Sequence, residues 1–198
     1  MDNLEYIETY LKNSLDVKMK LCSDRVLLES IKSTAELIES RYRTGHKVLL
    51  AGNGGSAADA QHIAAEFVSR FFYDRPGLPA IALTTDSSML TAIGNDYGFE
   101  NLFSRQVQAQ GSKGDVFIGI STSGNSENIV KAVHEANAKG ITTIAFCGSE
   151  GILAGLVDIA LAVPSDCTPY IQECHICIGH IICGLVEKNI FPRASADV

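Results

Sequence analysis

The fold is decided by residues 115–126, which have the sequence DVFIGISTSGNS. The first half is an almost wholly apolar run, as expected of a strand that is covered on both faces of its sheet. The second half is a polar turn of serines, threonine, glycine and asparagine, and it opens a predicted helix with apolar residues at Ile129, Val130 and Val133. A strand, a polar turn and a helix in this order form one unit of an α/β fold.

Similar units lie on both sides of this one. Short apolar runs occur at residues 47–51, 80–83, 115–120, 142–146 and 159–163, and each is expected to be followed by a helical stretch. Because parallel strands need helical crossovers, this alternation predicts a three-layer α/β/α sandwich with a central parallel five-stranded sheet.

Helices are expected at both ends of the chain. Residues 3–42 have apolar side chains at helical spacing and no glycine or proline, which predicts two amphipathic helices closed by Gly45. A last long helix is expected from about Pro169 to Lys188. We therefore expect one domain over residues 1–198, with an N-terminal helical segment at 1–45 and an α/β core at 46–190. No role is expected for the tail at 191–198.

The composition excludes several classes of protein. The 198 residues are 46% hydrophobic, and 16 basic against 23 acidic side chains give a formal charge of −7. With no basic run, nucleic acid is not an expected partner. No export signal and no membrane span are evident, so a cytoplasmic protein is expected.

The cysteine content suggests reduced thiols. In a chain without an export signal the six cysteines are expected to be unpaired. Cys174 and Cys177 have the spacing of a redox or zinc pair, but no second such pair and no thioredoxin-type strand and turn accompany them. Packing in a helix interior is the favoured interpretation.

The turn at residues 121–126 has the composition of an anion site. At a helix N-terminus the first amide groups lack partners and the helix dipole is positive, while hydroxyl groups add donors. Such a cluster can also be an ordinary helix cap and turn. Four hydroxyl groups in six residues exceed what capping requires, so phosphate binding is favoured.

A second glycine-rich turn occupies residues 52–56 and precedes a helix expected from Ala57 to about Phe71. It matches neither the dinucleotide fingerprint nor the Walker loop, and a sugar-sized ligand fits it better. On the helix that follows, His62 and Glu66 are four residues apart and share one face. Such a pair can hold a metal or a substrate, although a surface contact is the more common reason for this spacing.

Three segments carry a resemblance to a known family: GNGGSAADAQH at 52–62, GISTSGNS at 119–126 and IQECH at 171–175. The chain resembles the phosphoheptose isomerase branch of the SIS (sugar isomerase) superfamily over nearly its whole length. The resemblance implies an aldose–ketose isomerase that converts sedoheptulose 7-phosphate to D-glycero-D-manno-heptose 7-phosphate, as the α or β anomer, in bacterial heptose biosynthesis for lipopolysaccharide or capsule. It also implies a homotetramer with active sites at subunit interfaces.

The same resemblance implies roles for individual residues. Glu66 is expected as the catalytic base and His180 as the acid. One Zn²⁺ per subunit is expected at His62, Glu66, Gln172 and His180. The substrate-binding residues are expected to be Asn53, Gly54, Gly55, Glu66, Asn95, Asp96, Ser121, Thr122, Ser123, Ser126 and Gln172.

Several points stay open at this stage. Gln172 and His180 are eight residues, or about 12 Å, apart along one helix, so a shared ion requires their side chains to converge. Coordination would also lower the basicity of Glu66. His175 is expected to be a packing or exposed residue, Arg70 is left outside the site, and Tyr170 departs from the charged residue common in the family.

Two other functions compete with this one. One is a non-catalytic SIS-domain regulator that binds a phosphosugar or a protein, and the other is an isomerase or epimerase of another phosphosugar. Oligomer formation is also expected, because the long amphipathic helices at the start and end of the chain offer more apolar surface than one small sheet can cover, notably Ile176, Ile178, Ile181, Ile182, Leu185 and Val186.

Overall fold

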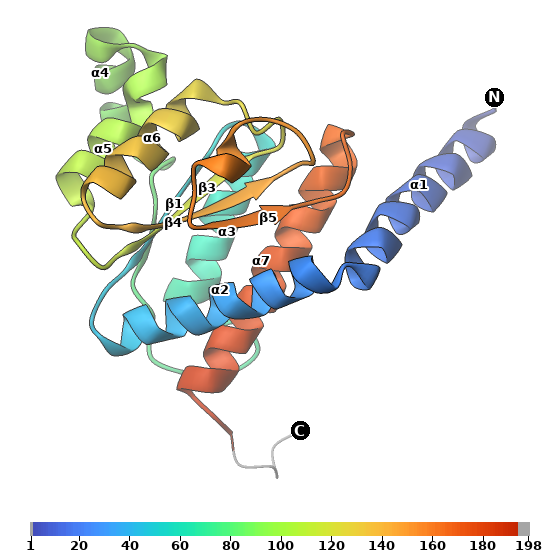
Figure 1. Ribbon diagram of the computed structural model, residues 1–198, viewed down its shortest axis with the longest axis horizontal. Helices are drawn as coiled ribbons and strands as arrows, with labels where there is room; N and C mark the ends of the chain where they lie inside the picture. The colour runs from blue at the N-terminus through green and yellow to red at the C-terminus, as the bar shows by residue number, and fades with distance from the viewer. Residues whose placement is uncertain (1, 194–198) are drawn as a thin grey trace.

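A parallel sheet in the order β2-β1-β3-β4-β5 lies at the centre of the computed structural model, which describes residues 2–193 (Figure 1). The strands pair in continuous parallel register, with Val48 of β1 beside Ala80 on one side and Val116 on the other. The predicted sandwich and its strands are confirmed to within a residue or two. The strands are β1 (Val48–Gly52), β2 (Ala80–Ala82), β3 (Val116–Ser121), β4 (Thr142–Cys147) and β5 (Ile159–Ala162).

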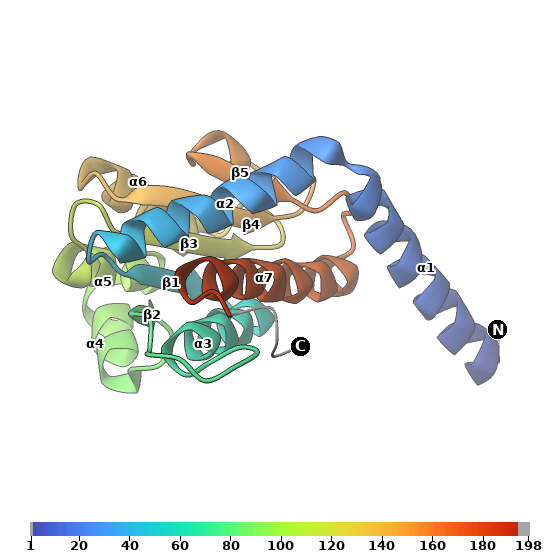
Figure 2. The same ribbon diagram turned by 90° about the horizontal axis from the view of Figure 1, so that it is seen from below.

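Helices cover both faces of the sheet and make it a three-layer structure (Figures 1 and 2). Successive residues of β1 point to opposite faces: Leu50 packs in the core under α2, α3 and α7, whereas Leu49 packs in the core under α5 and α6. The helices are α1 (Asn3–Ser23), α2 (Arg25–Arg43), α3 (Gly55–Val68), α4 (Ser87–Tyr97), α5 (Leu102–Gln110), α6 (Glu127–Ala138) and α7 (Thr168–Ile190), with short 3-10 turns η1 (Phe99–Asn101) and η2 (Leu153–Gly155).

Two predictions of helical stretches are wrong, one in its existence and one in its length. The stretch after β4 is a loop with the single turn η2, whose Leu153 is fully buried in the core on that face. The helix α3 ends at Val68 rather than near Phe71, because the guanidinium group of Arg75 binds the carbonyl oxygens of Glu66 and Phe67 in its last turn. The last helix is slightly longer than predicted, running from Thr168 to Ile190.

The helix α1 projects from the body, and its first two turns extend away from the rest of the described residues (Figures 1 and 2). The predicted apolar spacing is present, but Leu4, Leu11 and Leu15 are 72%, 62% and 59% exposed. The rest of α1 is fastened to α7, where Glu173 accepts hydrogen bonds from Tyr10, near the middle of α1, and from Lys18. The ring of Tyr170 contacts that of Tyr10, so this departure from the family pattern packs on α1.

The apolar surface expected on α7 is wrong for three of its six residues. Ile178, Ile182 and Val186 are at most 1% exposed and belong to the core, because the face that carries them packs on the sheet. Ile181 is the exposed member of that group, at 40%. Exposed apolar side chains are therefore more numerous on α1 than on α7.

The cysteines are unpaired, as expected, and each lies within the described chain. Cys174 and Cys183 are buried in the core, whereas Cys177 is exposed. Among residues 2–193, no helix combines the length and the apolar character needed to span a bilayer. Residues 194–198 of the C-terminal tail lie outside the described residues.

Candidate active site

The hydroxyl groups of the turn after β3 lie close to one another, and that of the N-cap residue does not cap the helix that follows. Ser121 Oγ lies 2.9 Å from Ser126 Oγ and 3.5 Å from Ser123 Oγ. Ser126 is the N-cap residue of α6, yet its side chain makes no capping hydrogen bond. The start of α6 thus has no side-chain cap, and several hydroxyl groups gather beside it, which is the composition of a phosphate site.

Gly124 holds the tight backbone of this turn. Its φ of +64° lies in the region that L residues avoid, and a Cβ atom there would stand 2.4 Å from the carbonyl oxygen of Glu150. The neighbouring β4–η2 loop therefore closes on the turn at a distance that only glycine permits.

The second glycine turn is joined to the first by a reciprocal pair of amides. Asn53 Nδ2 donates to Asn128 Oδ1, and Asn128 Nδ2 donates to Asn53 Oδ1, each at 2.9 Å. Asn128 is 3% exposed and lies in the first turn of α6. The side chain of Asn53 is therefore occupied in linking the two turns, and Asn128 is a site residue that sequence analysis missed.

A cavity of about 320 Å³ lies between the two turns and the start of α7. Its walls come from carboxyl ends of β1 and β3, the edge at which parallel α/β sheets bind ligands. Neither helix that starts there, α3 or α6, has a side-chain cap. The lining residues are Asn53, Gly54, Gly55, Ser56, Ile120, Ser121, Thr122, Ser126, Thr168 and Gln172.

His62, Glu66 and His180 converge from α3 and α7. One ligand atom from each lies within 4.8 Å of the others, and His62 Nε2 lies 2.9 Å from His180 Nε2 and 3.2 Å from Glu66 Oε1. Imidazole nitrogens and a carboxylate oxygen are donors that Zn²⁺ binds, and here one such atom from each of three residues lies within reach of a single ion. The residues present fit a divalent metal ion.

Gln172 lies toward the other end of the same seam between α3 and α7. Its amide contacts the start of α3, where a Cβ atom on Gly55 would be 2.5 Å from Gln172 Nε2. His62 follows Gly55 by seven residues, a rise of about 10 Å. The two helices therefore run side by side from the cavity toward the three converging groups (Figure 2).

Asn95 and Asp96 lie in a helix, not in the expected loop. They belong to α4, which begins with Asp86 as N-cap and ends before Gly98 at φ +89°. Both side chains are exposed and hydrogen-bonded to each other at 2.8 Å, and neither lines the cavity described above. Within residues 2–193 of one chain, the structure does not bring them to the other candidate residues.

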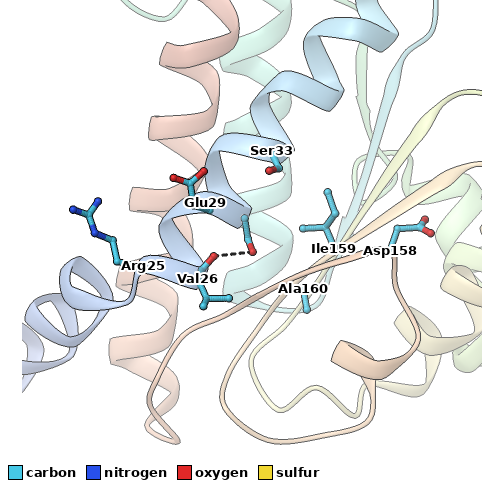
Figure 3. A pocket seen from close by; sticks show the side chains of 8 residues that line it. Arg25, Val26, Glu29, Ser33, Asp158, Ile159 and Ala160 are labelled. Carbon is cyan, nitrogen blue, oxygen red and sulfur yellow. Dashed lines mark hydrogen bonds between the residues drawn. The ribbon is translucent and has the colours of Figure 1, made fainter.

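A larger hollow of about 620 Å³ lies between α2 and β5, beside Val26, Glu29 and Ile159 (Figure 3). It opens at the amino end of β5, where Asp158 precedes the strand. Ligands of parallel sheets bind at the opposite edge. Of its polar groups, Ser30 donates to the carbonyl of Val26 one turn before it. The smaller cavity is therefore the better candidate.

Two further residues near the converging groups were not predicted. The ring of Phe71 lies 5.4 Å from that of His180, which places an aromatic wall beside the imidazole. Asp59 is one turn before His62 on α3, and burial raises the pKa of its carboxyl while the charge of His62 opposes the rise. His175 is fully buried and hydrogen-bonded to Cys147, as a packing residue would be.

Comparison with known proteins identifies the class to which this fold and site belong. A family model for the SIS domain matches residues 9–148, so the chain belongs to the SIS domain family. The phosphoheptose isomerase 2 of Campylobacter jejuni is 59% identical over 195 residues, covering 98% of this chain and 97% of the relative.

Other relatives agree. The phosphoheptose isomerase of Aneurinibacillus thermoaerophilus is 58% identical, covering 98% of each chain. The solved phosphoheptose isomerase of Francisella tularensis matches with a TM-score of 0.91 at 40% identity, covering 95% of this chain and all of that one. Within the SIS domain family, the chain is therefore a member of the phosphoheptose isomerase group.

Proposed function

We propose that the chain interconverts sedoheptulose 7-phosphate and D-glycero-D-manno-heptose 7-phosphate in bacterial heptose biosynthesis. Membership of the phosphoheptose isomerase group, at 59% identity over nearly the whole chain, makes it an isomerase. The observation that carries the chemical part of the proposal is the convergence of His62, Glu66 and His180 within 4.8 Å.

The phosphate end of the substrate binds in the cavity at the two turns. Ser121, Thr122, Ser123 and Ser126 supply hydroxyl groups, and the uncapped start of α6 supplies amides and a positive dipole. The glycines at 54 and 55 leave room for the sugar chain. A phosphosugar bound there extends along the seam of α3 and α7 toward the converging groups.

Glu66 and His180 carry out the proton transfers. The reaction moves one proton between neighbouring carbons and another between the two oxygens, through an enediol. The Glu66 carboxylate removes the proton from the carbon beside the carbonyl and returns it to the neighbour. His180 donates a proton to the carbonyl oxygen and takes back the proton of the neighbouring hydroxyl group, so that both residues end in their starting protonation states. The ring of Phe71 lies 5.4 Å from that of His180 and forms an apolar wall on one side of it.

His62, Glu66, His180 and Gln172 would hold one Zn²⁺ per subunit. When bound, the ion supplies a positive charge that stabilises negative charge on the enediolate oxygens. The support for the ion is the donor set itself, with two imidazole nitrogens 2.9 Å apart and a carboxylate beside them. Gln172 joins this set only as the family resemblance implies, since its amide lies beside Gly55.

The activity is tested by incubating the purified chain with sedoheptulose 7-phosphate and separating ketose from aldose by chromatography. Glu66→Gln should lower kcat by at least about 100-fold, the scale of a lost general base, with little change in substrate binding. Glu36→Gln, on the exposed face of α2, is the matched control and should turn over normally. Near-normal turnover by Glu66→Gln would remove this residue from its role.

The metal is tested by chelation. Removing divalent ions should lower turnover strongly, and Zn²⁺ added back should restore it. Full activity in protein shown to be metal-free by atomic absorption would remove the ion from the proposal.

A homotetramer in the cytoplasm, with active sites at subunit interfaces, completes the proposal. Its support is the exposed apolar row of α1, including Leu4, Leu11 and Leu15, on a helix that projects from the body (Figure 1). Leu11→Lys combined with Leu15→Lys should reduce the mass measured by light scattering. Asn13→Lys, on the same helix, is the control. An unchanged mass in the double variant would contradict this role of α1.

A further inference from the structure

A buried ion pair joins the loop after α3 to the end of α7. Arg75 Nε lies 3.2 Å from Glu187 Oε1, and the two side chains are 2% and 1% exposed. A buried pair costs much desolvation and is tolerated only where the remaining donors and acceptors are satisfied. Neither residue belongs to the sequence segments that mark the family. The other contacts of the two side chains show what the ion pair holds in place.

Arg75 holds the last turn of α3, the turn that carries Glu66. Its two terminal nitrogens donate to the carbonyl oxygens of Phe67 at 2.5 Å and Glu66 at 2.7 Å. These carbonyls lie at the helix C-terminus, where partners within the helix are lacking and a positive charge is favourable. The backbone of Glu66 is therefore fixed by the guanidinium group.

Glu187 holds the aromatic segment that covers His180. Its two carboxylate oxygens accept hydrogen bonds from the amides of Phe71 at 2.8 Å and Phe72 at 2.7 Å. Glu187 follows His180 by seven residues, about two turns, so both project from one face of α7. The ring of Phe71 is thereby kept 5.4 Å from the ring of His180.

We propose that Arg75 and Glu187 are positioning residues that set the separation of α3 and α7 at the level of the reacting groups. The inference rests on the proposed function, because it concerns the same His62, Glu66 and His180. Arg75 places the turn of Glu66, Glu187 places the wall of His180, and the ion pair fixes one against the other. A displacement of about 1 Å at reacting groups can cost about 100-fold in rate.

The main test is Glu187→Gln, which keeps the shape and one acceptor oxygen but loses the charge. Zn²⁺ affinity is measured by competition with a chromophoric chelator, alongside kcat and KM. Loss of a group that orients ligands typically weakens metal binding by about 10- to 100-fold. We expect that loss in Zn²⁺ affinity and a fall in kcat of similar size, with KM changed by less than about threefold, because the cavity for the phosphate is formed by other residues.

Asp115→Asn is a matched control. Asp115 directly precedes β3, so it lies at the amino end of that strand, opposite the end that lines the cavity. Asp115 also accepts two backbone amides, from Lys47 and Ser112, and pairs with a cation, Lys47 Nζ at 2.6 Å, with its side chain 2% exposed. Its loss should lower stability while leaving Zn²⁺ affinity and kcat of the folded protein unchanged. If Asp115→Asn weakens Zn²⁺ binding as much as Glu187→Gln does, the effect is a general loosening and the proposal fails.

Arg75→Lys is the second variant, read in the same way should Glu187→Gln fail to fold. Lysine keeps the charge but lacks the planar fork that reaches several acceptors, so Zn²⁺ affinity and kcat should again fall. A folded variant with both values within twofold of the wild type would overturn the inference. A wild type that binds Zn²⁺ but does not isomerise the substrate would overturn the proposed function alone, and the affinity comparison would still test the positioning.

Discussion

The burial of His175 predicts a loss of stability in mild acid. Its Nε2–H donates to the carbonyl oxygen of Cys147 at 3.1 Å, and Nδ1 has no partner within the described residues. A proton on Nδ1 would add a buried charge and an unsatisfied donor. Burial therefore lowers the pKa of His175 from 6.5 to about 4, although the hydrogen bond to Cys147 opposes the change.

The sign and size follow from this depressed pKa. Above pH 6.5 both folded and unfolded chains are neutral at this group, and its contribution to stability is complete. As the pH falls toward 4, the unfolded chain takes up a proton that the folded chain refuses, so the folded state loses stability. Each pH unit between 6.5 and about 4 is worth about 1.4 kcal/mol, which gives a total loss of about 3 kcal/mol.

The assay is urea unfolding of metal-free protein at pH 7.5 and pH 4.5, for the wild type and for His175→Gln. Glutamine can donate to Cys147 but does not titrate, and all other groups cancel in the comparison. His134→Gln, an exposed histidine of α6, is the control and should behave as the wild type does. Equal losses of stability in the wild type and His175→Gln would refute the reasoning.

Three further predictions concern other contacts. Asn128→Ala leaves the amide of Asn53 without its partner and should lower kcat/KM by roughly 5- to 150-fold, which corresponds to the 1–3 kcal/mol of an unsatisfied group; unchanged kinetics would contradict the link between the two turns. Gly124→Ala forces a side chain into φ +64° and against Glu150, so urea unfolding should show a loss of about 1–3 kcal/mol and KM should rise. The hydrogen bond from Lys18 lowers the pKa of Glu173, so this carboxylate stabilises the fold fully above its unfolded pKa of 4.5 and the effect is lost as the pH falls through the lower, folded value. Because the group is about one-third exposed, Glu173→Gln should remove less than about 1 kcal/mol of that acid dependence, measured by thermal unfolding between pH 6 and pH 3.

The sheet could be predicted because its strands are buried on both faces. Val48, Leu49, Leu50 and Ala51 are all 0% exposed, and the continuous apolar run that this burial requires is visible in the sequence. The turns after β1 and β3 could be predicted for a related reason. Glycine and hydroxyl residues between a strand and a helix have few structural alternatives in an α/β fold.

The helix α4 could not be predicted from the pair Asn95-Asp96, because these residues favour turns when their surroundings are unknown. The decisive signals are at the ends of the helix instead. Asp86 accepts a hydrogen bond from the amide of Met89 and caps the start, and Gly98 ends the helix four residues after Gly94. A capped helix of this length accommodates the pair in its last turn.

The position of α1 relative to the body also could not be predicted from the sequence. Its apolar residues have the spacing of an amphipathic helix, which predicts a packed face. Periodicity, however, does not state whether the partner surface belongs to the same chain. Within the described residues, the buried side chains of α1 are Ser14, Val17 and Leu21, all in the half that contacts the rest of the chain.

The seam between α3 and α7 explains why motifs alone do not define the site. A glycine in a helix interior lowers the stability of the helix, and the sequence does not show which helix packs against it. In the structure, a Cβ atom on Gly179 would stand 2.6 Å from Ile63 Cδ1. Gly55 makes the same close approach to Gln172 at the other end. Glycines on both helices thus let the backbones come near enough for His62 and His180 to meet at 2.9 Å. The site is a property of the spacing between two helices, and that spacing depends also on Gly179, which lies outside the segments that mark the family.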